Sequence, residues 1–176
     1  MKKEIEIKEY LKYYWLEEYL EKKVRPAFYK NHYLNEEQFF TIIFWKSKRP
    51  RKRKRKYLSN EKIVELTSNI YKEQSEEGKL KILLQQHGIN IAMASAILSV
   101  LYPDDFTVYD INVREIINYP DISTLSLERK VDRYLNEYVP MVRKQSNKLS
   151  LRDCDRALWA KYWYQDLERF LIEVKP

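Results

Sequence analysis

Residues 87–114 read HGINIAMASAILSVLYPDDFTVYDINVR and contain no lysine, although the whole chain holds 33 lysines and arginines. Small side chains alternate with larger apolar ones from Ile91 to Leu101, which predicts a buried helix that packs closely against its neighbours. Gly88, one of only two glycines in the chain, stands where the preceding helix must end. Asp110 stands where the next helix must begin, because aspartate is a favoured N-cap. The stretch therefore predicts a helix, a tight turn, a buried helix and an extended connection to another helix.

Length and composition fit one helical domain. A chain of 176 residues is long enough to bury one core. Two glycines and six prolines are too few for the many turns of an all-β protein, whereas residues that favour helices abound. We therefore expect an all-α fold, in which residues 1–176 form a single compact helical domain.

Several classes of site and location are disfavoured by the composition. The chain has one cysteine, Cys154, and two histidines, His32 and His87, so a disulfide, a cysteine-bound iron–sulfur cluster or a zinc site is not expected. Its first residues are charged and lack the apolar core of a signal peptide, and no later run has the length of a membrane span. We expect a cytoplasmic monomer that has no membrane partner, metal or small-molecule cofactor.

Apolar residues at helical spacing extend over most of the remaining chain. The first helix is predicted to end before Pro26, and Pro140 is predicted to kink or break a later one. The last helix is predicted to pack an aromatic face on the domain. Asp153 and Asp155 are predicted to lie in its first turn, where negative charge stabilises a helix, and this stabilisation is enough to explain both acids. Besides residues 91–101, the predicted helices cover about 4–24, 36–45, 59–71, 76–86, 111–118, 125–146 and 150–172.

Positive charge is concentrated in one segment. Residues 46–56 read KSKRPRKRKRK, with nine basic side chains in eleven positions, and removing those nine charges from the net charge of +7 leaves −2. The repulsion between like charges, together with Pro50, favours an exposed loop over about 46–57. Such a loop suits a nucleic acid, because lysines and arginines release counterions from phosphates. The basic residues concerned are Lys46, Lys48, Arg49, Arg51, Lys52, Arg53, Lys54, Arg55 and Lys56.

The turn at residues 87–90 also suits an anion. Backbone N–H groups of a tight turn and the positive N-terminus of the following helix together attract phosphate. The candidate phosphate contacts there are Gly88, Ile89 and Asn90. A nucleic acid is therefore the partner that both the turn and the basic loop favour.

Two short motifs within this stretch are similar to the helix-hairpin-helix superfamily of DNA glycosylases, whose hairpin reads L-P-G-V-G-x-x-T-A and is followed by V-D-T-H-V. The segment from Gln86 to Ala94 corresponds to the hairpin motif, and the whole helix-hairpin-helix would cover about 80–101. The segment from Tyr109 to Val113 corresponds to the second motif. Gly88 and Asp110 are 22 positions apart, which suits the family. His87, Asn90 and Asn112 replace the family's proline, second glycine and histidine.

The resemblance implies a DNA-binding enzyme of base excision repair that flips a damaged or modified base and hydrolyses its N-glycosidic bond. Asp110 would be the catalytic carboxylate, which stabilises the cationic sugar in the transition state. Trp45 and Tyr109 are candidates for the slot that receives the flipped base. Members that also cleave the strand carry a lysine early in the second hairpin helix, where this chain has none, so we expect base removal without efficient lyase activity unless Lys46 or Lys79 replaces it.

Other interpretations of the same residues remain open. Gly88 is also typical of a plain helix end, and Asp110 of a plain N-cap. The chain could be a helix-hairpin-helix module that binds DNA without catalysis, or an interaction domain in which the basic loop contributes only solubility. Trp45 stands at the end of an apolar helix, where a tryptophan is more often a core residue than a slot residue.

Overall fold

The computed structural model describes residues 15–47 and 58–173, and every regular element in these two ranges is helical. The chain is all-α, as the sequence predicts. The described elements are α1 Trp15–Tyr19, η2 Leu20–Val24, α2 Arg25–Asn31, α3 Glu36–Lys46, α5 Asn60–Lys72, α6 Glu76–Leu84, α7 Ile91–Leu101, α8 Ile111–Ile116, α9 Leu127–Arg133, η3 Tyr134–Tyr138, α10 Val139–Arg143 and α11 Leu151–Glu173. None of the helices within these ranges has the length and apolar character needed to cross a membrane.

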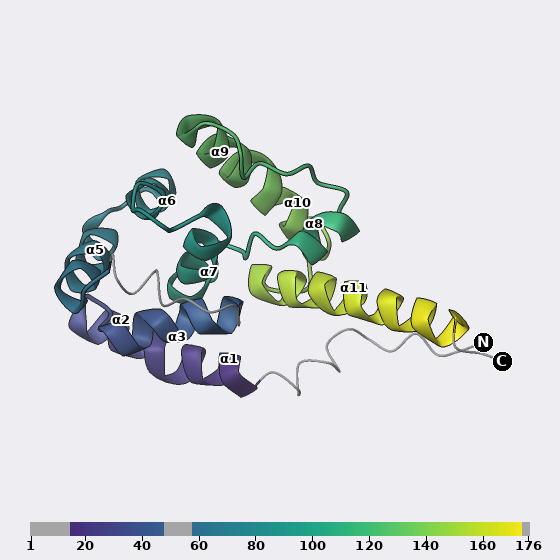
Figure 1. Ribbon diagram of the computed structural model, residues 1–176, viewed down its shortest axis with the longest axis horizontal. Helices are drawn as coiled ribbons and strands as arrows, with labels where there is room; N and C mark the ends of the chain where they lie inside the picture. Colours follow the sequence, from purple (N-terminus) through teal and green to yellow (C-terminus); the bar gives the residue numbers. More distant parts are fainter. Residues whose placement is uncertain (1–14, 48–57, 174–176) are drawn as a thin grey trace.

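Helix α7 lies at the centre of the molecule (Figure 1). All of its residues except Ala92 are buried, which confirms the buried helix predicted for residues 91–101. Helices α2, α3 and α6 pack against it. Its small side chains explain this close packing, since they allow neighbouring backbones to approach on several sides.

Four helix starts use the side-chain caps that the sequence offers. Asn35 begins α3 with a capping box, in which its side chain accepts from the Gln38 N–H and Gln38 accepts from the Asn35 N–H. Ser59, Ser75 and Asn90 accept from the N–H three residues later at the starts of α5, α6 and α7. The predicted starts of these helices are confirmed within a residue.

The predicted helix end before Pro26 was wrong, and of the two alternatives predicted for Pro140, a kink or a break, the break was wrong. Both prolines lie inside continuous helical segments, and each follows a wider π-helical turn, η2 or η3. In these turns the Arg25 and Val139 N–H groups donate to carbonyls five residues earlier. A wider turn relieves the clash between a proline ring and the carbonyl four residues before it, so the helix continues.

Helix α11 extends away from the other helices along its second half (Figure 1). Trp159 is partly buried against the core, whereas Trp163 and Leu167 are 52% and 50% exposed. The aromatic face therefore packs on the domain only in its first part, which corrects the predicted packing along the whole helix. The part of the first predicted helix that precedes Trp15 lies outside the described residues.

Candidate functional site

Asp110 uses its two carboxylate oxygens for different purposes. Oδ1 accepts a hydrogen bond from the Asn112 N–H at 2.9 Å, so Asp110 is the N-cap of α8, as predicted. Oδ2 forms an ion pair with Nζ of Lys46, the last residue of α3. The side chains of Asp110 and Lys46 are only 16% and 14% exposed. Asp110 is therefore more than a cap, because it also meets a lysine that is 64 positions away in the sequence.

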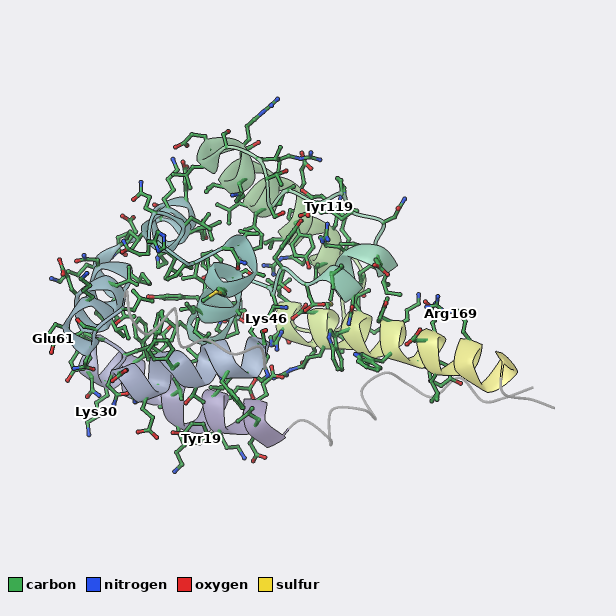
Figure 2. All side chains as sticks on the ribbon, in the orientation of Figure 1. Tyr19, Lys30, Lys46, Glu61, Tyr119 and Arg169 are labelled. Carbon is green, nitrogen blue, oxygen red and sulfur yellow. The ribbon has the colours of Figure 1, made fainter. Side chains whose placement is uncertain are left out.

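Lys46 lies where the end of α3 meets the beginning of α11 (Figure 2). It was predicted to contact phosphates, and the structure pairs it with Asp110. Lys79, the other lysine considered as a nucleophile, is elsewhere: its Nζ donates to the Gln74 carbonyl at 2.9 Å and lies over the Tyr102 ring. Of these two lysines, only Lys46 reaches Asp110.

The backbone that leads into Asp110 is held by two buried tyrosines of η3. The Tyr134 hydroxyl donates to the Thr107 carbonyl and accepts from the Thr107 N–H. The Tyr138 hydroxyl donates to the Val108 carbonyl at 2.8 Å and accepts from the Asp110 N–H at 3.4 Å. In a β-sheet, the backbone N–H and carbonyl groups of an extended segment form hydrogen bonds to a neighbouring strand; here the two tyrosine hydroxyls form these hydrogen bonds instead. They fix the position of the Asp110 backbone.

A small cavity of about 100 Å³ opens beside the Lys46–Asp110 pair. Trp45, predicted as a slot residue, lines it, with the Arg152 guanidinium 5.0 Å from its ring centre. The full lining is Trp45, Lys46, Val108, Asp110, Arg152, Asp155, Arg156 and Trp159. Three segments distant in the sequence thus bring charged and aromatic side chains around one space.

Tyr109, the other predicted slot residue, lies in the core rather than at this cavity. Its side chain is buried, its hydroxyl donates to Asp121 at 3.0 Å, and it accepts from the Ile122 N–H at 2.8 Å. Its own N–H donates to Ser95 of α7. An aromatic residue next to the key aspartate was a reasonable candidate, but the alternation of side chains along an extended segment turns it away from the Asp110 side chain.

Behind the cavity lies a buried ion network that the sequence interpretation missed. Glu17 of α1 accepts from both Arg152 and Arg156, and Arg152 also pairs with Asp155. The Glu17, Arg152 and Asp155 side chains are 8% exposed or less. The spacing of Arg152 and Arg156, four residues apart on one helix face, was the available signal, but Glu17 lies more than 130 positions away.

Asp155 was interpreted as an ordinary first-turn acid, and the structure corrects this, because Asp155 is 3% exposed and lines the cavity. Burial raises its pKa to about 6; the Arg152 guanidinium and, more weakly, Lys46 oppose the rise, while Asp110 and Glu17 add to it. Asp153, by contrast, is partly exposed and pairs with Arg156. The two acids of this turn therefore differ in environment, and only Asp155 shares the cavity with Asp110.

The turn between α6 and α7 differs from the expectation in detail. Helix α6 ends at Leu84, earlier than predicted, and Gly88 follows in the turn with φ of +85° instead of closing the helix. Asn90 is extended, with φ of −98°, and its side chain caps α7. Ile89 is buried and its N–H donates to the Gln86 carbonyl, so this N–H is not available to a phosphate. Gly88 and Asn90 are exposed.

Most of the predicted basic loop lies outside the described residues. This applies to Lys48, Arg49, Arg51, Lys52, Arg53, Lys54, Arg55 and Lys56.

Comparisons with models of protein families, with curated proteins and with solved structures find no match to this chain. The candidate site therefore stands on its own geometry.

Proposed function

We propose that the chain binds double-stranded DNA and excises a damaged or modified base by hydrolysis of its N-glycosidic bond, with Asp110 as the catalytic carboxylate. One observation carries the proposal: the basic run begins with Lys46, whose side chain reaches Asp110 beside the cavity. The first residue of the segment that favours phosphates thus contacts the carboxylate that the glycosylase resemblance implies.

Lys46 is the only basic residue of this run within the described part of the chain, and its side chain contacts Asp110. In the proposed complex, the basic residues that follow Lys46 in the sequence hold the duplex phosphates while the extruded nucleotide enters beside Asp110. Gly88 and Asn90, both exposed, remain candidates for a second phosphate contact.

The chemistry suits a partly enclosed carboxylate. Breaking the bond between C1′ and the base nitrogen leaves positive charge on the sugar, which an adjacent carboxylate stabilises while water adds to C1′. The place of the lyase lysine in the resembling family holds Ile91, Ala92 and Met93. Lys46 is ion-paired, and an ammonium group is not a nucleophile, so the proposal is for hydrolysis without strand cleavage.

The size of the cavity favours a second candidate function, a DNA-binding module without catalysis. Ligand pockets typically have about 300–1,000 Å³, and this cavity has about 100 Å³. Entry of a base therefore requires the Trp45 or Lys46 side chain to move. In a module that only binds, Lys46 and Asp110 would stay paired when DNA binds.

A panel of duplexes, each with one lesion, separates these functions. Base excision predicts abasic sites, detected as strand breaks after alkali, in at least one duplex, whereas the binding module predicts affinity with no abasic site in any. Borohydride should trap no covalent complex. A trapped complex that is lost in Lys46→Gln would contradict the assignment of hydrolysis and identify Lys46 as a lyase nucleophile.

Salt dependence tests the DNA-binding part separately. Replacing Arg51, Lys52, Arg53 and Lys54 with serine should weaken binding to unrelated duplexes alike, and should reduce the slope of log affinity against log salt by about one unit per lost phosphate contact. Replacing four lysines outside the segment, Lys23, Lys30, Lys62 and Lys72, with serine gives a control with the same change in net charge. Equal slopes in the two variants would contradict a role for the basic segment.

A further inference from the structure

The cavity beside Asp110 contains a second carboxyl group. Asp155 comes from α11, whereas Asp110 precedes α8, and both side chains line the same small space. Two carboxyl groups in one site act differently when their surroundings differ. Asp110 caps a helix and pairs with Lys46, whereas Asp155 is buried below it and pairs with Arg152.

The buried network around Asp155 gives this carboxyl group only a shared cation. Among the described residues, Asp155 forms an ion pair with Arg152 alone, and Arg152 also pairs with Glu17. Glu17 has one buried oxygen, Oε2, without a hydrogen-bond partner in the described part of the chain. A buried carboxylate that shares its one cation with a second buried carboxylate is stabilised by taking up a proton.

The groups that face Asp155 come from every element around it. Arg152 is on its own helix, Lys46 comes from α3, Asp110 from the start of α8 and Glu17 from α1. Tyr134 and Tyr138 of η3 are also close enough for the charge of Asp155 to raise the pKa of their hydroxyls. The first two residues are positive, the next two negative, and the tyrosines neutral, so no net positive charge compensates for the burial of the Asp155 carboxylate.

We propose that Asp155 is the general acid of this site, which donates its proton to the leaving base while Asp110 faces the sugar. In this step the C1′–N bond breaks and its electron pair goes to the base, where it takes the proton from the Asp155 carboxyl. Water forms the new bond to C1′ and returns one proton to the Asp155 carboxylate, so the residue is restored. The inference rests on the proposed base excision and adds the second catalytic group to it.

The pH dependence follows from the environment of Asp155. Its pKa is raised to about 6, and a general acid acts in its protonated form. Release of a neutral base should therefore slow as pH rises through about 6. This falling limb of the plot of rate against pH is measured on the unaltered protein, so the measurement does not depend on whether a variant folds.

The test compares leaving groups. Hypoxanthine needs a proton to leave as a neutral base, whereas N7-methylguanine already carries a positive charge and leaves as a neutral molecule without one. Asp155→Asn should slow the release of hypoxanthine by about 100-fold or more and remove the limb near pH 6, while the release of N7-methylguanine changes little. Asp153→Asn, in the same helical turn, should leave both rates within about twofold.

The possible outcomes distinguish the inference from the proposed function. Equal losses with both bases in Asp155→Asn, or an unchanged rate with hypoxanthine, would overturn the general acid and leave base excision in place. A wild-type pH profile without the limb near pH 6 would do the same. If the wild-type protein releases neither base nor any other from the lesion panel, base excision itself fails, and the inference fails with it.

Discussion

The α6–α7 turn is stabilised by contacts between residues close together in the sequence, whereas the cavity beside Asp110 depends on contacts between distant segments. The turn is stabilised by its own neighbours, because Ile89 bonds to the Gln86 carbonyl and the Asn90 side chain caps α7 three residues further on. The cavity is lined by the end of α3, by the segment that leads into α8 and by α11. The ion network next to it reaches α1 through a contact between residues 139 positions apart. A local change should therefore disturb the turn alone, whereas the cavity depends on how the helices pack.

The largest expected effect lies in the cavity. Arg152→Met removes the cation that Glu17 and Asp155 share and leaves two buried carboxylates short of positive charge. We expect a loss of roughly 3–5 kcal/mol in the free energy of unfolding, measured by urea denaturation. Arg169→Met is the matched control, because Arg169 is exposed on the same helix, where it pairs with Asp166 and donates to the Gln165 carbonyl; it should cost less than about 1 kcal/mol. Similar losses in both variants would mean that the buried network adds nothing to stability.

A smaller effect is expected where the cavity meets the backbone. Tyr138→Phe keeps the ring in the core but deprives the Val108 carbonyl and the Asp110 N–H of their partner. Leaving such groups unsatisfied costs about 1–3 kcal/mol. Tyr19→Phe, at an exposed position, should change the free energy of unfolding by less than about 0.5 kcal/mol. The explanation of how Asp110 is positioned is wrong if the two phenylalanine variants unfold at the same urea concentration.

The smallest effect belongs to the turn. Asn90→Ala removes the side chain that accepts from the Met93 N–H, and should cost about 1 kcal/mol. Asn90→Ser should restore most of this loss, since serine caps about as well. Amide hydrogen exchange should report the loss in the first turn of α7, with the amides around Asp110 unchanged. Faster exchange around Asp110 as well would show that the turn and the cavity are coupled.

The same contrast explains what could be predicted from the sequence. Helix starts at Asn35, Ser59, Ser75 and Asn90 were predictable, because a cap needs only a partner three residues away. The continuation of helices through Pro26 and Pro140 was not, since a π turn leaves no clear mark in the residue pattern.

The candidate site divides in the same way. Asp110 and Trp45 were identified because each stands at a helix end that the sequence marks. The pairing of Lys46 with Asp110, and the burial of Asp155 against Arg152, depend on the packing of α3, α8 and α11. No spacing rule predicts such contacts between distant segments, so Asp155 was interpreted as an ordinary acid of the first helical turn.

The central claim is that Asp110 is a catalytic carboxylate and not only a helix cap. Asp110→Asn keeps an oxygen that can accept from the Asn112 N–H but removes the negative charge. Base release from the duplex identified in the lesion panel is the decisive measurement, with duplex affinity and melting temperature from the same preparation and Asp105→Asn, an exposed aspartate, as control. We predict a folded protein that binds DNA at least as tightly as the wild type and releases base at least about 100-fold more slowly. Base release at the wild-type rate by folded Asp110→Asn would contradict the claim and leave Asp110 as a cap.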